Sequence, residues 1–116
     1  MSENPYPPSA QKGMSHMTNQ TVVEKIADYI ENHLEEDIPL DKIAKELNYS
    51  KFYIARVFAD NTGYTIYKYI QGRRLTLAAR KLAETDKPIV EIAYEARYGS
   101  QQAFTLAFSQ FYLCTP

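Results

Sequence analysis

The sequence of 116 residues contains one cysteine, four glycines, no tryptophan and no long apolar run. A single cysteine excludes an internal disulfide framework and is typical of a reducing compartment, so we expect a cytoplasmic protein. No segment approaches the roughly 18 apolar residues of a membrane-spanning helix, and no secretory signal opens the chain, which predicts no membrane partner. A chain of this length is expected to form one small domain.

The sequence patterns of enzymes and metal sites are also missing. The acidic run at residues 35–37 lacks the spacing of a metal-binding loop. No glycine-rich phosphate loop occurs, and no nucleophile–base pair can be argued from the sequence. We therefore expect no catalytic residue, no metal and no cofactor, and no small-molecule ligand is evident.

Charge is divided unevenly along the chain, although the net charge is only -1. Residues 1–50 hold four basic and nine acidic residues, whereas residues 51–116 hold nine basic and five acidic ones. Within residues 51–81, seven basic residues accompany a single acidic one, Asp60. Because local charge matters more to a polyanion than net charge does, this segment is either a solvated basic surface or a nucleic-acid site.

The helical pattern follows a tail rich in Pro, Ser and Asn. Residues 1–20 have no apolar period, so we expect a disordered tail, and the repeated Met14 and Met17 suggest that part of it is foreign to the natural chain. Thr21 and Glu24 form a T-x-x-E capping box, and the apolar steps of four residues that follow predict an amphipathic helix to about residue 35.

Two later segments have the form of a helix-turn-helix. The first covers about 40–61, with Ser50 as N-cap of its second helix, and a long helix over about 65–85 follows it. The second covers about 88–112, and the apolar residues four and eight positions after Ser100 repeat those after Ser50. Since no segment alternates like a strand, the expected fold class is all-α: two helix-turn-helix subdomains joined by a long linker helix in a homeodomain-like tandem.

The length of the linker helix suggests a function. A helix of about 20 residues is about 30 Å long, close to the roughly 34 Å at which the major groove of B-DNA repeats. One chain is thus able to place two recognition helices in successive major grooves of double-stranded DNA, as a monomer on an asymmetric site.

Three strings carry a family resemblance: DKIAKELNYSKFYIARVF, YIQGRRLTLAARKLAETDKPIVEIA and SQQAFT. With the order of the elements, they resemble the DNA-binding domain of the AraC/XylS family of transcription regulators, and most closely its small MarA/SoxS/Rob-like type, over about residues 21–116. The resemblance implies a bacterial domain of seven helices. It also implies binding to promoter DNA as a monomer and, usually, activation of transcription through contact with RNA polymerase.

The resemblance also implies DNA contacts at particular residues. For the first recognition helix these are Ser50, Lys51, Phe52, Tyr53, Ala55 and Arg56. For the second recognition helix they are Ser100, Gln101, Gln102 and Thr105. An Arg side chain is able to form two hydrogen bonds with a guanine, and an aromatic ring is able to contact a thymine methyl. A Gln amide is able to form hydrogen bonds with an adenine or a phosphate.

In the first recognition helix, Ala55 stands where the subgroup often has Gln. Four further positions depart from the family pattern. Leu106 and Ser109 stand where the family has an Arg and commonly a Lys, and Arg97 and Leu113 replace glycines. The position of Arg97 often needs a positive φ, which is uncommon for Arg. We therefore expect base contacts mainly from the first recognition helix and weaker anchoring from the second. The candidate phosphate contacts are Arg73, Arg74 and Arg97.

The final residues CTP resemble the start of the family's last short helix. We therefore expect that helix to be truncated, or the sequence to be a fragment of a longer protein. An alternative function stays open: a helical interaction module, or a fragment of a ligand-responsive regulator, with weakened DNA binding. The salt dependence of duplex binding distinguishes the two functions, because phosphate contacts release counterions.

Overall fold

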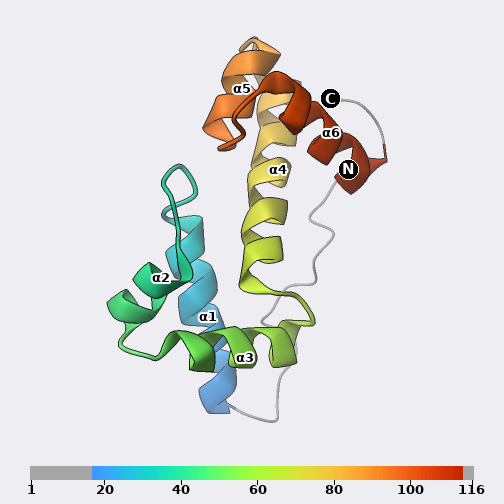
Figure 1. The fold of residues 1–116 in the computed structure, drawn as a ribbon. Helices are drawn as coiled ribbons and strands as arrows, with labels where there is room; N and C mark the ends of the chain where they lie inside the picture. The colour runs from blue at the N-terminus through green and yellow to red at the C-terminus, as the bar shows by residue number, and fades with distance from the viewer. Residues whose placement is uncertain (1–16, 114–116) are drawn as a thin grey trace. The chain divides into compact units, whose positions relative to one another are not determined.

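The structure is a computed structural model that describes residues 17–113. Within these residues it has no strand and six helices, α1 (Met17–Glu31), α2 (Leu40–Leu47), α3 (Lys51–Thr62), α4 (Ile66–Glu84), α5 (Ile89–Glu95) and α6 (Gln101–Tyr112), which Figure 1 labels. The expected all-α class is confirmed. The described chain forms two compact units, residues 17–70 and 71–113, and α4 runs from one into the other.

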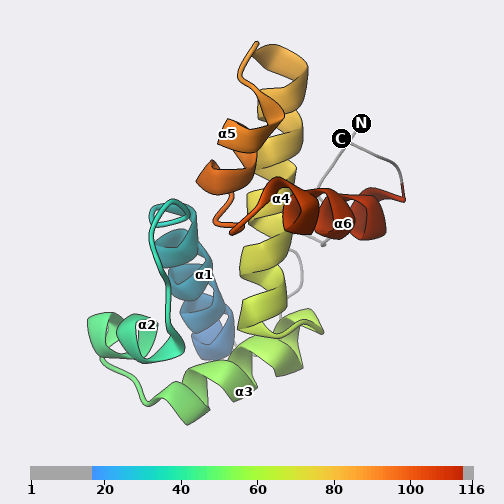
Figure 2. The ribbon, with the colours of Figure 1, turned by 45° about the horizontal axis from the view of Figure 1, so that its top comes forward.

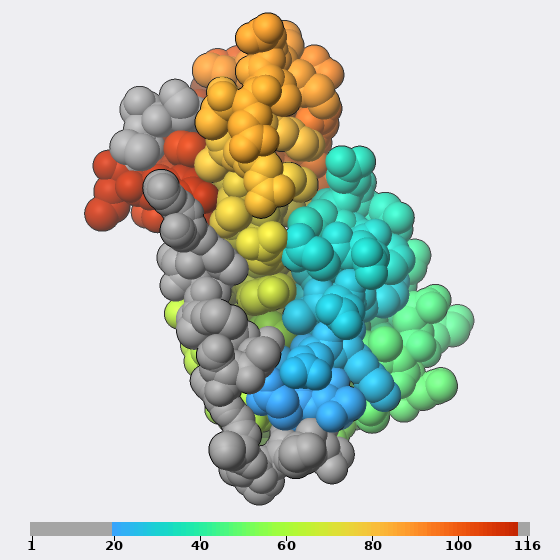
Figure 3. All heavy atoms as spheres, turned by 180° about the vertical axis from the view of Figure 1, so that it is seen from behind, coloured from blue at the N-terminus to red at the C-terminus, as the bar shows by residue number. Residues whose placement is uncertain are grey.

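The first unit is built on α1, which packs against both helices of the first helix-turn-helix. Figure 2 shows α1 lying beside α2 and above α3, and in Figure 3 the blue atoms of α1 adjoin the green atoms of that pair. The apolar stripes of the three helices close over one core. Its fully buried members include Val22, Val23, Ile26, Ile30, Ile43, Ile54 and Phe58.

The start of α1 differs from the expected one. The helix begins at Met17, so Thr21 lies inside it and does not serve as its N-cap. The tail expected over residues 1–20 is therefore helical in its last four residues, and its remainder lies outside the described residues. The truncated final helix that was expected near Cys114 also lies outside them.

The second unit packs α5 and α6 on the later turns of α4. Its buried core consists of Leu75, Ala78, Ile92, Ala93, Ala96, Phe104 and Phe108. The rings of Phe104 and Phe108 lie 5.6 Å apart between centroids, and the ring of Phe108 lies 4.7 Å from that of Tyr112. Aromatic pairs at these distances stabilise a helix face beyond its buried area. The link from α6 to α4 comes from the shared core and from the Tyr112 hydroxyl, which donates to Thr76 Oγ1 at 3.4 Å.

An ion-pair cluster fastens α5 to α4 within this unit. The Glu95 carboxylate accepts bonds from Lys81 Nζ at 2.7 Å and from Lys87 Nζ at 2.8 Å. The hydrogen bond from Lys81, followed by that from Lys87, holds the pKa of the Glu95 carboxyl below its usual value. Lys81 is therefore engaged within the protein, and its charge is not available in full to a polyanion.

The first helices of the two helix-turn-helix motifs begin and end alike. Each begins after a proline in the extended conformation, Pro39 and Pro88, with ψ of 149° in both. A residue in the left-handed conformation follows each helix: Asn48 directly after α2, with φ of 63°, and Arg97 two residues after α5, with φ of 71°. The next residue, Tyr in both copies, donates its N–H to the carbonyl five residues back, at 2.9 and 3.0 Å. This pair of features is the Schellman way of ending a helix.

The second helices of the two motifs are also alike at both ends. The hydroxyl oxygens of Ser50 and Ser100 each accept a hydrogen bond, at 3.1 Å, from the backbone N–H three residues later. Both serines are thus confirmed as N-caps. Gly63 and Leu113 end α3 and α6 in the left-handed conformation, with φ of 82° and 60°. From the serine caps onward, positions that are 50 residues apart therefore correspond to each other.

Candidate nucleic-acid interface

The first turn of α3 presents its side chains to solvent. The Ser50 cap leaves Lys51 and Phe52 at the exposed start of the helix, and the Phe52 side chain is 79% exposed. A large aromatic ring this exposed has no role in the core. It is available to a ligand, as the family resemblance implies for this position.

The exposed side of α3 follows from the side that is buried. Ile54, Val57 and Phe58 turn into the core, so the remaining positions point outward or lie at the margin. Tyr53 is half-buried, and its ring lies 5.4 Å from the ring of Tyr49 in the turn, so it packs on the protein itself. We call the side of α3 that continues from its exposed first turn the α3 face. It consists of the exposed Lys51, Phe52 and Arg56 and the half-buried Ala55 and Ala59.

Lys51 already has contacts inside the first unit. Its Nζ lies 3.2 Å from an Asp41 carboxylate oxygen on α2 and 5.8 Å from the centre of the Phe52 ring. An exposed pair of this kind contributes at most about 1 kcal/mol, so a phosphate group is able to compete for the ammonium. The sequence expectation missed Asp41, which stands ten residues before Lys51 and shares no helical period with it.

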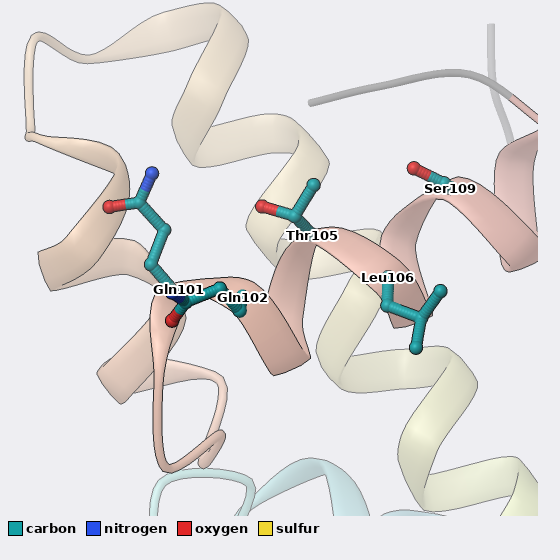
Figure 4. A pocket seen from close by; sticks show the side chains of 5 residues that line it. All are labelled: Gln101, Gln102, Thr105, Leu106 and Ser109. Atoms are coloured by element: carbon teal, nitrogen blue, oxygen red, sulfur yellow. The ribbon is translucent and has the colours of Figure 1, made fainter.

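The α6 face is a shallow hollow on the side of α6 away from the core. Figure 4 shows the five side chains that line it, arranged along one helix. They are Gln101, Gln102, Thr105, Leu106 and Ser109. Three of them were expected as DNA contacts, and the other two, Leu106 and Ser109, had been singled out only as departures from the family pattern.

The two faces occupy corresponding positions. Adding 50 to each residue number of the α3 face gives the α6 face, and the exposure classes agree at all five positions. Their chemistry differs. Arg56 corresponds to Leu106, which is 60% exposed, and Lys51 corresponds to Gln101. The α3 face therefore carries two positive charges, whereas the α6 face carries none.

The expected phosphate contacts lie in the second unit. All three arginines take part in interactions within the protein. Arg73 and Arg74 are half-buried on α4, and Arg97 is exposed in the turn before α6. With Lys51 and Lys81 engaged by carboxylates, the local positive charge of residues 51–81 is smaller than its formal count suggests. The DNA contacts at these residues stay predictions.

Metal sites and membrane spans are two further features that bear on function. Among residues 17–113, no group of three or more His, Cys, Asp or Glu side chains is placed to hold a metal ion. Over the same residues, no helix combines the length and apolarity that a membrane span requires.

Known proteins resemble this chain in both sequence and fold. Residues 43–116 match a family described as a helix-turn-helix domain. The Regulatory protein SoxS of Salmonella typhimurium is 37% identical over 100 residues, which span 86% of this chain and 94% of SoxS. The Transcriptional regulator Rob of the same organism is 38% identical over an equal share of this chain but over only 35% of Rob. The structure of a transcriptional regulator from Chromobacterium violaceum, described by its AraC-type DNA-binding domain, has a TM-score of 0.82 at 26% identity and covers 87% of this chain and 90% of its own.

Proposed function

Because the chain belongs to the AraC/XylS family of DNA-binding transcription regulators, we propose that it binds specific promoter sequences and activates transcription from them. One observation carries the proposal: two serine-capped helices, α3 and α6, expose corresponding faces in two helix-turn-helix motifs. In this motif the N-terminal residues of the second helix contact base edges in the major groove. The α3 and α6 faces begin at that end of each helix.

The proposed binding mode places α3 and α6 in successive major grooves of an asymmetric site. The 19-residue helix α4 joins the two motifs, and a helix of that length is about 28 Å long, comparable with the groove repeat of roughly 34 Å. Each unit then needs one groove, and a single chain suffices. We therefore propose that the protein binds as a monomer.

The α3 face supplies most of the base recognition in this proposal. Arg56 is exposed on α3, and a guanidinium is able to donate two hydrogen bonds to the O6 and N7 atoms of guanine. Phe52 contacts a thymine methyl in the same groove. Lys51, Arg73, Arg74 and Arg97 contact phosphates, which fix the register without reading sequence.

The remaining partner and the location follow from the family. We propose RNA polymerase as the protein partner through which the bound regulator activates transcription, and the cytoplasm as the place where it acts. Transcription in vitro with purified polymerase tests this step. A promoter that carries the DNA site preferred by this protein should give more transcript with the protein than without it. An unchanged or lower yield would contradict activation.

Selection of binding sites from random duplexes tests DNA recognition directly. We expect one enriched bipartite sequence, and a Kd for it that rises steeply with salt. About four phosphate contacts give a slope near -3.6 when the logarithm of the association constant K is plotted against the logarithm of the salt concentration. Enrichment of no sequence, together with weak binding that salt hardly changes, would favour the helical interaction module. Two features favour this alternative of a helical interaction module: Lys51 and Lys81 are paired with carboxylates, and the α6 face carries no charge.

A further inference from the structure

We propose that the α6 face recognises A·T base pairs, with Gln102 bonded to an adenine and Leu106 against a thymine methyl. The α3 face requires a guanine, through Arg56. The DNA site is then chemically divided, with a guanine in the half bound by α3 and A·T pairs in the half bound by α6. This inference rests on the proposed function, because it assumes that duplex DNA is the ligand.

Leu106 is the first reason for this assignment. Its side chain is 60% exposed and lines the hollow of the α6 face, so it is not needed for the core of the second unit. A leucine has no hydrogen-bonding group. The one group on a base edge of the major groove that suits it is the C5-methyl of thymine, and that contact removes apolar surface of both partners from water.

Gln102 is the second reason. It lies one helical turn before Leu106, and Figure 4 shows both side chains along α6, away from the helices that pack beneath it. A glutamine amide is able to bond the N6 and N7 atoms of adenine together, the pairing that its donor and acceptor match best. Residues four apart on one helix face are neighbours, so the amide and the leucine reach adjacent base pairs.

The rest of the α6 face supports A·T recognition because it has no side chain that favours guanine. Thr105 and Ser109 are half-buried and carry short hydroxyls, and Gln101 is neutral. No member of the face has the forked cation that bonds guanine most strongly. The side chains of this face also release few counterions, so substitutions among them by other neutral residues should leave the salt dependence of binding nearly unchanged.

The corresponding position of α3 has the opposite chemistry. Arg56 stands 50 residues before Leu106, at the same place relative to its serine cap. Both residues are exposed, so placing either residue at the other position should have little effect on the core. Leu106→Arg and Arg56→Leu are therefore a matched pair of variants.

Site selection with these two variants is the first test. Leu106→Arg should change the preference at one position of the α6 half from thymine to guanine, by about 10-fold or more. Arg56→Leu should remove the guanine preference from the other half and leave the α6 half unchanged. Circular dichroism and melting curves check that both variants fold. A guanine that the wild-type protein requires in both halves would overturn the inference.

Replacing thymine with uracil in the selected duplex is the second test, since it removes only the methyl group. In the α6 half, this replacement should weaken wild-type binding about three- to fivefold, the worth of one buried methyl, and should not affect Leu106→Ala. Equal losses for the two proteins would overturn the inference while leaving DNA binding intact. If the wild-type protein selects no duplex at all, the proposed function itself fails, and that result is distinct from both others.

Discussion

Asn48 and Arg97 occupy the same left-handed backbone conformation at the ends of α2 and α5, with φ of 63° and 71°. Each is followed by a tyrosine whose N–H closes the helix end. Asn is one of the few residues that tolerate this conformation, whereas most other residues with a Cβ atom are disfavoured there by about 1 kcal/mol or more. The second motif therefore holds an arginine at a cost in stability that the first motif avoids.

The strained position of Arg97 leads to a prediction with two parts. Arg97→Asn should raise the free energy of unfolding by about 0.5–1 kcal/mol and should weaken DNA binding through the loss of one phosphate contact. The slope of log K against log salt should become shallower by about 0.9. Urea unfolding and titrations of a labelled duplex at several salt concentrations measure the two effects.

Arg97→Ala is the matched control for this prediction. Alanine removes the same charge but keeps the backbone strain, so it should weaken DNA binding as Asn does and give no gain in stability. If DNA binding is unchanged in both variants, Arg97 contacts no phosphate.

Arg56 is predicted to read one base pair. Arg56→Ala should cost about 1–3 kcal/mol on the selected site and relax the preference at a single position. Arg80→Ala removes the same charge from an exposed position of α4, outside the α3 face, and serves as the control. Kd values for the selected duplex and for a random duplex distinguish the roles, since equal losses on both for Arg56→Ala would mean that Arg56 touches only the backbone.

Glu95 makes the stability of the second unit depend on pH. Its carboxyl pKa is lowered by Lys81 and Lys87, so it stabilises the fold fully above the pKa of the unfolded chain. That contribution is lost as the pH falls through the lower pKa of the folded state. Glu95→Gln should therefore reduce the free energy of unfolding near neutral pH, by up to about 1 kcal/mol, and the difference from wild type should shrink in acid.

Urea unfolding at about pH 7 and about pH 3 measures this difference. Glu91→Gln, on the exposed side of the same helix, makes the same change in formal charge and should have little effect at either pH. If Glu95→Gln lowers the free energy of unfolding by the same amount at both pH values, the ion pairs with Lys81 and Lys87 are not the cause of the loss.

Local chemistry explains which features the sequence could predict. Ser50 and Ser100 were recognisable as N-caps because capping involves only a serine and the next three residues. The bonds of Lys51 to Asp41 and of Lys81 to Glu95 join separate helices, and no sequence period marks them. Thr21 failed as a cap because capping motifs also occur inside helices, and nothing in the local sequence stopped α1 from extending back to Met17.

Asp41 is predicted to restrain the DNA affinity of the α3 face. Its carboxylate lies 3.2 Å from Lys51 Nζ, so it competes with a phosphate for that ammonium and repels the phosphate itself. Asp41→Asn should therefore tighten binding to the selected duplex, by about two- to fivefold at low salt, the range of an exposed ion pair. The gain should shrink as salt is added, because exposed charges are screened.

A double-mutant cycle separates the two effects of Asp41. Without Lys51, in Lys51→Ala, the same Asp41→Asn change should give a clearly smaller gain, because only the general repulsion then remains to be relieved. An equal gain in both backgrounds would mean that the ion pair does not compete with DNA. Weaker binding by Asp41→Asn would mean the reverse role, in which Asp41 orients Lys51 toward the phosphate, and the α3 face would then be preorganised by α2.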